Sequence, residues 1–163
     1  MDDQLDMGKV IYVVGENGAG KSTFIAKNYR SDDFFIVEFP AEFLEELKGT
    51  GDVEIDLLIG TYNQLNGDML EAFFEGKSVV IEVCADSAGE EPFTNLIERS
   101  TKIGIHTSLV MIACDADKRE VRLIGAENEP GYFSSSLLFP YVLEIYEGFV
   151  ESIELSKNMG FVK

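Results

Sequence analysis

Basic residues are scarce in this sequence: 13 lysines and arginines stand against 30 aspartates and glutamates, and the formal net charge is −17. Proteins that hold polynucleotides or anionic membranes over a broad surface neutralise phosphates with clustered lysine and arginine. The deficit therefore argues against nucleic acids and membranes as partners. A small anionic ligand is still compatible with it, because a single loop can be positive within a negative protein.

The sequence also has few residues of the kinds that build zinc sites, disulfides or nucleophilic triads. Its two cysteines, Cys84 and Cys114, lack the spacing of zinc ligands and end apolar runs, which predicts buried thiols. The single histidine, His106, shares no motif with a serine or cysteine nucleophile, and we interpret it as structural. No apolar run reaches the length of a membrane span, and residues 1–6 are acidic and polar, unlike a signal peptide. A cytoplasmic location fits these features.

Residues 15–22, GENGAGKS, form a complete phosphate-binding loop of the pattern G-x-x-x-x-G-K-[ST]. Its glycines let the backbone curl around an anion, and the following helix adds its positive N-terminal end. In this motif Lys21 contacts the β- and γ-phosphates and Ser22 ligates Mg²⁺, so ATP and Mg²⁺ are the predicted ligands. A glycine-rich turn with an exposed lysine is the alternative interpretation. The predicted nucleotide-binding residues are Gly15, Asn17, Gly18, Ala19, Gly20, Lys21, Ser22 and Thr23.

Patterns typical of strands and helices alternate along the chain, without internal repeats. Continuous apolar strands that alternate with helices indicate a parallel sheet covered on both faces. We therefore predict an α/β fold of the three-layer P-loop NTPase class, with a mainly parallel sheet. The predicted strands are 9–14, 34–38, 78–84, 107–113 and 120–124, with a short edge strand at 160–163. The predicted helices begin near residues 23, 42, 55, 92 and 136.

Glycines mark the expected ends of several helices. Gly49 is predicted to end the helix at 42–48, Gly76 the long helix at 55–73, and Gly104 the helix that begins at Pro92. Gly148 is expected to interrupt the last helix, 136–157.

The chain is predicted to be one domain, because 163 residues suffice for a full core and 45% of them are hydrophobic. We place this nucleotide-binding domain at 9–163, after a flexible acidic N-terminus at 1–8. A candidate lid lies around 115–134.

Glu82, Glu38 and Glu42 are the main acidic candidates for the chemistry beside the loop, and Asp86, just beyond the third predicted strand, is a further one. Glu82 follows the apolar run at 79–81, where a carboxylate is costly unless it reaches a cation, so we predict that it helps to hold Mg²⁺. Glu38 ends the second predicted strand at the sheet edge where α/β proteins bind ligands, and could accept the proton of an acceptor hydroxyl. Glu42, one helical turn on, is the alternative base.

Lys118, Arg119 and Arg122 are the only close basic cluster in the sequence. They follow the fourth predicted strand, where a lid would lie. Arg119 and Arg122 are therefore candidates for neutralising the charge of a transferred phosphoryl group. Ordinary surface charge that balances neighbouring acids is the equally weighted alternative.

The loop sequence GENGAGKST resembles that of ABC-transporter ATPases, but the chain is too short for that domain and has no LSGGQ-like signature. A wider resemblance, over about residues 9–114, is to the zeta-toxin-like branch of small P-loop kinases. It includes VVGENGAGKST, the long helix running into GKSVVIE, and ERSTKIGIHTSLVMIA. The resemblance implies that Lys21 and Ser22 bind phosphate and metal, that Glu82 lies near them, and that Glu38 or Glu42 replaces the family's catalytic aspartate.

Two features of the resemblance bear on substrate and topology. The family's substrate-binding arginine beside that aspartate is missing from the stretch EFPAE at 38–42, which leaves the sugar-nucleotide substrate of zeta toxins open. In the strand order of P-loop kinases, the first strand lies between those ending near Cys84 and Cys114, which keeps the two thiols too far apart for a disulfide.

The leading functional prediction is a kinase that transfers the γ-phosphoryl group of ATP to a hydroxyl of a small molecule. A nucleotide-dependent NTPase or switch that acts on a protein partner is the second. A nucleotide-binding module whose catalytic residues have been lost is the third.

Overall fold

The centre of the fold is a sheet of four parallel strands: β1 (Val10–Gly15), β2 (Phe34–Ile36), β3 (Ser78–Cys84) and β4 (Thr107–Met111). The computed structural model describes residues 8–15, 20–84, 90–112 and 135–160, with the backbone alone at 135–137. Within these residues the strand order is β2-β3-β1-β4. As predicted, β1 lies between the strand that ends at Cys84 and the fourth strand, whereas Cys114 lies outside the described residues.

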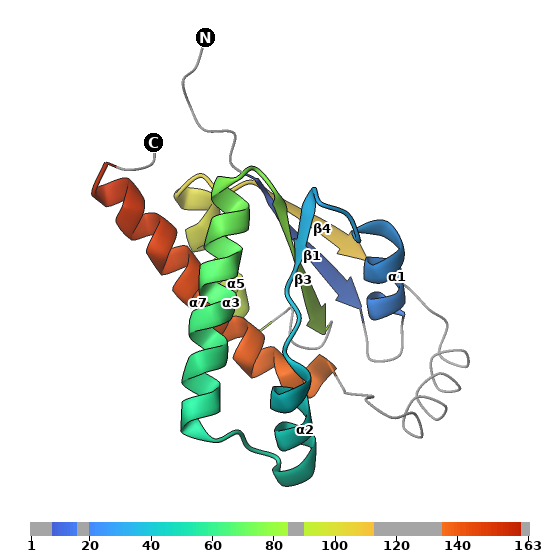
Figure 1. The fold of residues 1–163 in the computed structure, drawn as a ribbon. Coiled ribbons are helices and arrows are strands. Elements are labelled where there is room, and N and C mark those ends of the chain that lie inside the picture. The colour runs from blue at the N-terminus through green and yellow to red at the C-terminus, as the bar shows by residue number, and fades with distance from the viewer. Residues whose placement is uncertain (1–7, 16–19, 85–89, 113–134, 161–163) are drawn as a thin grey trace.

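Helices cover both faces of the sheet, so the predicted three-layer α/β architecture is confirmed (Figure 1). Among the described residues, one helix packs on one face and three pack on the other. The single helix is α1 (Lys21–Asn28), and the opposite layer consists of α3 (Ile55–Phe74), α5 (Glu91–Lys102) and α7 (Ser135–Asn158). The short helix α2 (Ala41–Thr50) connects β2 to α3 and packs at the end of that layer. No helix of the described part is long and apolar enough to cross a membrane.

The alternating side chains of β1 separate the core into two parts. Tyr12, on one face, belongs to the large core beneath α3, α5 and α7, and Val13, on the other, packs with Ile25 of α1. Every residue of β1 is buried. The continuous apolar run at 10–14 therefore corresponds to a central strand, as its sequence predicts. Coverage is incomplete at β4, where Leu109 and Met111 are exposed.

Several predicted element ends are wrong in detail. Strand β2 ends at Ile36, two residues before Glu38, although the Val37 N–H still donates to the Val80 carbonyl at 3.0 Å. Helix α2 continues through Gly49 and ends before Gly51, whose φ of 77° is the left-handed conformation that suits glycine at a helix end. Four predicted segments lie outside the described residues. They are the strand at 120–124, the edge strand at 160–163 except Gly160, the N-terminus at 1–8 except Gly8, and the candidate lid around 115–134.

Gly148 does not interrupt α7, contrary to expectation. It lies where α7 meets α3, and a Cβ there would come within 3.1 Å of the Asn66 amide oxygen. A glycine is therefore placed in this helix for close packing rather than as a breaker.

Three hydroxyl groups inside the large core join β1, α5 and α7. The Tyr12 hydroxyl donates to that of Tyr146 at 2.6 Å, and the Tyr146 hydroxyl lies 2.9 Å from Ser100 Oγ. Ser100 donates in turn to the Leu96 carbonyl at 2.7 Å. Burial is the main cause that raises the pKa of both tyrosines above its ordinary value.

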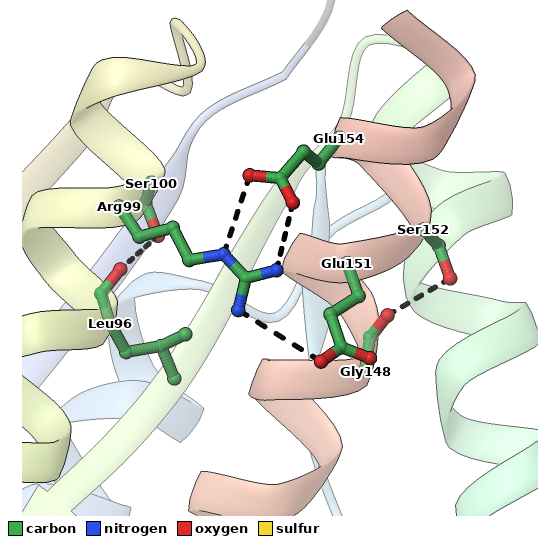
Figure 2. A network of polar contacts seen from close by, with 7 residues as sticks. All are labelled: Leu96, Arg99, Ser100, Gly148, Glu151, Ser152 and Glu154. Atoms are coloured by element: carbon green, nitrogen blue, oxygen red, sulfur yellow. Dashed lines mark hydrogen bonds and ion pairs between the residues drawn. The ribbon is translucent and has the colours of Figure 1, made fainter. Parts of the chain in front are cut away.

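On the surface, one arginine joins the same two helices (Figure 2). Arg99 of α5 donates from Nη2 and Nε to the two carboxylate oxygens of Glu154 on α7, at 2.9 and 3.4 Å. Its third nitrogen lies 3.9 Å from Glu151. The hydrogen bonds from Arg99 lower the pKa of Glu154.

Candidate active site

The phosphate-binding motif lies between β1 and α1, as the strand–loop–helix arrangement requires. Gly20 precedes the first residue of α1 with φ 95° and ψ 24°, a left-handed conformation that disfavours residues with a Cβ. At the other end of the loop, a Cβ on Gly15 would lie 3.0 Å from the Ile112 carbonyl oxygen. The outer glycines of the motif are therefore required by the backbone itself. Asn17, Gly18 and Ala19 lie outside the described residues.

Lys21, the lysine of the motif, is 4% exposed. Its Nζ donates to the carbonyl of Gly15 at 2.7 Å, so the side chain lies back across the start of the loop. Burial of an ammonium group is costly unless it has hydrogen-bond acceptors. Lys21 is therefore not the exposed lysine of the alternative interpretation, and its role in binding phosphate stays a prediction.

Ser22 and Glu82 come together although 60 residues separate them. Ser22, at the start of α1, donates from Oγ to Oε1 of Glu82 at 2.9 Å. Glu82 lies in β3 opposite Val13 of β1, on the face that α1 covers. The two residues predicted to hold a metal thus share one hydrogen bond. Thr23 is exposed, as Ser22 is.

The donor set of this pair fits Mg²⁺. The ion takes oxygen ligands and in nucleotide sites uses one or two from the protein, with substrate phosphates and water as the rest. A serine hydroxyl and one carboxylate supply that number. No group of three metal-binding side chains occurs in the part of the chain that the structure describes, and such a cluster is not what a nucleotide-bound Mg²⁺ needs.

Glu38 lies two residues beyond the end of β2. The pairing of β2 with β3 ends at Ile36↔Val80, followed by the hydrogen bond from the Val37 N–H to the Val80 carbonyl. An exposed ion pair joins Glu38 Oε1 to Nη2 of Arg30 at 3.3 Å. Glu42, the alternative base, lies exposed in the first turn of α2.

Arg30, the ion-pair partner of Glu38, is a residue that the sequence did not single out. It follows α1, and a tight turn over residues 31–33 brings it back alongside β2. The only sequence signal was the short Ser-Asp-Asp connection, which indicates a reversal without showing which later side chain Arg30 meets. The cations that the sequence did suggest, Arg119 and Arg122, lie outside the described residues with Lys118.

Comparison with known proteins bears on the fold. No family model matches the sequence, and no curated protein matches it. Among solved structures, a chain of the Pnkp1/Rnl/Hen1 RNA repair complex is 15% identical, with a TM-score of 0.58 over 97% of this chain and 48% of that one. The protein has the α/β fold of P-loop NTPases. It spans about half the length of the structure that it matches.

A second solved structure is more distant. Deoxyadenosine kinase from M. mycoides with bound dATP is 14% identical, with a TM-score of 0.39 over 88% of this chain and 84% of that one. This likeness is too weak to add to the argument. The resemblance to zeta-toxin-like kinases stays a prediction.

Proposed function

We propose that this protein binds ATP with Mg²⁺ and transfers the γ-phosphoryl group to a hydroxyl of a small molecule, in the manner of zeta-toxin-like kinases. The observation that carries the proposal is the contact between Ser22 of the phosphate loop and Glu82 of β3, 2.9 Å apart. A glycine-rich anion loop alone could hold many ligands. A hydroxyl and a carboxylate that converge beside it are the donors expected for the metal of a nucleoside triphosphate.

The chain's own residues divide the chemistry among them. Backbone N–H groups of the loop and Lys21 would hold the phosphates, and Ser22 and Glu82 would hold Mg²⁺, which would neutralise phosphate charge. Glu38 accepts the proton of the acceptor hydroxyl. The oxygen of that hydroxyl forms a bond to the γ-phosphorus. The bond from that phosphorus to the oxygen of ADP breaks at the same time. Arg119 and Arg122 are proposed to neutralise the charge on the transferred group.

A small acceptor fits the charge of the chain better than RNA does. One similar structure is named as an RNA repair complex, yet this protein has 13 basic residues against 30 acidic ones. An RNA strand would need several phosphate contacts from lysine and arginine. We therefore propose a free hydroxyl compound as the acceptor, with the sugar nucleotides of zeta toxins as one class to test.

A nucleotide-dependent hydrolase or switch is the second candidate. The observation that favours it is the exposure of the Glu38 side chain, 61%, which leaves the proposed base open to water. A kinase keeps water from the γ-phosphate until its acceptor arrives. ATP consumption with and without a panel of hydroxyl compounds separates the two, because a switch consumes ATP at one slow rate in both cases.

Titration calorimetry with ATP and Mg²⁺ tests the nucleotide site. Lys21→Ala should weaken ATP binding about 10- to 100-fold, because it removes a charge-assisted contact with phosphate. Lys27→Ala, on the exposed side of the same helix, is the matched control and should bind as the unaltered protein does. Circular dichroism checks that both variants are folded. Equal affinities of Lys21→Ala and the control would refute the phosphate-loop interpretation.

A further inference from the structure

We propose that the outer edge of β2 docks an extended segment of a partner protein, rich in lysine or arginine, which adds a strand to the sheet. The inference goes beyond the proposed function, because it concerns a protein partner rather than a nucleotide. In the strand order β2-β3-β1-β4, β2 has a neighbouring strand on one side only within the described residues. An exposed strand edge of this kind is where another chain can add a strand.

The hydrogen bonds between β2 and β3 fix which backbone groups face outward. The Asp33 carbonyl accepts from β3 and the Val37 N–H donates to β3, each with an N···O distance of 3.0 Å. Successive residues of a strand direct these groups to opposite sides, so Phe34 and Ile36 face away from β3. The Phe34 N–H donates to the Ser31 carbonyl at 3.2 Å. The outer edge therefore offers the carbonyl of Phe34 and both backbone groups of Ile36.

A hollow of about 220 Å³ lies beside this edge. Its lining comes from β2, from α3 and from the residue before β3: Phe35, Asp68, Glu71, Ala72, Glu75 and Lys77. One water molecule needs only about 10–15 Å³ of such space, so the hollow admits a long side chain. Phe35 faces the core beneath α3, and a residue level with it on an added strand would point to the same face, beside the hollow.

The charges of the lining select a basic side chain. Lys77 Nζ lies 3.5 Å from Glu75 Oε2, so these two charges balance each other. Asp68 accepts from the neutral amide of Gln64 and keeps its negative charge unbalanced. Glu71 has no side-chain partner among the described residues. An apolar wall beside two unbalanced carboxylates suits the aliphatic stem and cationic end of lysine or arginine.

Charge opposes the occupants that this chain itself offers. A second copy carries a net charge of −17, and residues 1–7 contain three aspartates and no lysine or arginine. Both would be repelled by an acidic hollow. Because β2 has only three residues, few backbone bonds are available, and the side chain in the hollow must supply the selectivity. A partner segment with basic residues at alternate positions fits, since alternation places them on one face.

The hollow and the phosphate loop lie at opposite ends of the parallel strands. Lys77 directly precedes the first residue of β3, whereas Gly15 is the last residue of β1 and begins the loop. A segment bound at β2 therefore leaves the nucleotide site open. Substitutions at the hollow should leave ATP binding unchanged, which also serves as a check that the variants are folded.

Fluorescence anisotropy with a labelled short peptide of alternating lysine and threonine, at physiological ionic strength, tests the inference. Glu71→Lys should weaken binding at least about 10-fold, because attraction at the hollow becomes repulsion. Glu98→Lys, at an exposed acid of α5, makes the same change in net charge and is the matched control. The same peptide methylated at every backbone nitrogen keeps its charge but cannot donate, and should bind at least about 10-fold more weakly.

Hydrogen exchange at the Ile36 N–H gives a second readout that surface charge does not affect. The peptide should slow this exchange at least about 10-fold, because the N–H becomes bonded to the added strand. Ile36→Pro removes this outward donor without removing a bond to β3, and should abolish peptide binding. Ile36→Val keeps the donor and should bind as the unaltered protein does. If Ile36→Pro does not fold, the exchange result decides.

Several outcomes would overturn the inference. Equal weakening by Glu71→Lys and Glu98→Lys, or equal binding of the methylated peptide, would show diffuse attraction to an acidic protein. Failure of the unaltered protein to bind the peptide, or unchanged exchange at Ile36, would also show that no strand is added. Self-association in sedimentation that Glu71→Lys abolishes would assign the edge to a second copy instead. None of these results bears on ATP binding, so the proposed function is tested separately.

Discussion

At the scale of single residues, the buried hydroxyls of Tyr12, Tyr146 and Ser100 form a hydrogen-bonded chain with one direction. Ser100 gives its proton to the Leu96 carbonyl, so Tyr146 must be the donor to Ser100, and Tyr12 the donor to Tyr146. Each member except Tyr12 is thus both donor and acceptor. A fully satisfied chain of this kind specifies how β1, α5 and α7 pack together.

The direction of the chain predicts unequal costs for two similar substitutions. Tyr146→Phe leaves the buried hydroxyl of Tyr12 without an acceptor, and should lower the free energy of unfolding by about 1–3 kcal/mol. Tyr12→Phe leaves no donor unpaired and should cost less than about 1 kcal/mol. Urea unfolding of the two variants measures the difference. Equal losses would show that the hydroxyl protons are arranged differently.

At the scale of the elements, the contact between α3 and α7 depends on how closely the two helices approach at Gly148. The Asn66 side chain of α3 fills the space that a Cβ on Gly148 would occupy. Its amide nitrogen donates to the Tyr62 carbonyl at 3.2 Å, while its buried oxygen has no partner among the described residues. Helix propensity alone would favour alanine here, and packing opposes it.

Two glycines in these helices give a matched comparison. Gly67→Ala in α3 meets open space and should raise the free energy of unfolding by about 0.5–1 kcal/mol through helix propensity. Gly148→Ala should give no such gain, because the Asn66 amide must move by a few tenths of an ångström. In a protein that already carries Asn66→Ala, Gly148→Ala should raise the free energy of unfolding as Gly67→Ala does. A gain at Gly148 without the second change would contradict this account of the contact.

The same scale shows how far local pattern predicts this fold. The runs at 10–14 and 79–81 are apolar on both faces and lie in the central strands β1 and β3. The periodicity from Ile55 to Phe73 matches α3 nearly residue for residue. The ends of elements were less predictable. Gly49 and Gly148 are glycines, which often end helices, but both lie inside helices here. A glycine's role depends on the neighbour that it meets, which no local window contains.

At the scale of the whole molecule, the buried tyrosines make stability sensitive to alkaline pH. The pKa of Tyr12 and that of Tyr146 are raised above the ordinary value of 10.0, chiefly by burial. In the unfolded chain these groups ionise near pH 10, whereas in the fold they stay neutral. Below about pH 10 both states are neutral, and the free energy of unfolding does not depend on these groups. Above about pH 10 the unfolded chain loses the protons that the folded protein keeps, so the free energy of unfolding falls as the pH rises.

Unfolding in urea between pH 8 and pH 11.5 checks this sign. The unaltered protein should lose stability steeply above about pH 10. The double variant Tyr12→Phe with Tyr146→Phe should lose it less steeply, because two groups no longer ionise on unfolding. Part of the slope should remain, since burial and a hydrogen bond to Glu144 also raise the pKa of Tyr62. Identical slopes would show that neither core tyrosine is held neutral.

The phosphate loop and the alternation of strands and helices are determined locally, because glycine content, β-branching and helical spacing act over a few neighbouring residues. Which carboxylate reaches Ser22, and which cation reaches Glu38, only the tertiary structure decided. The strand order puts β3 beside β1, and the turn after α1 returns Arg30 along β2. A contact such as that between Ser22 and Glu82, 60 residues apart, depends on strand order and register. Strand order and register minimise the exposed apolar surface of the whole chain, so no single segment of the sequence predicts them.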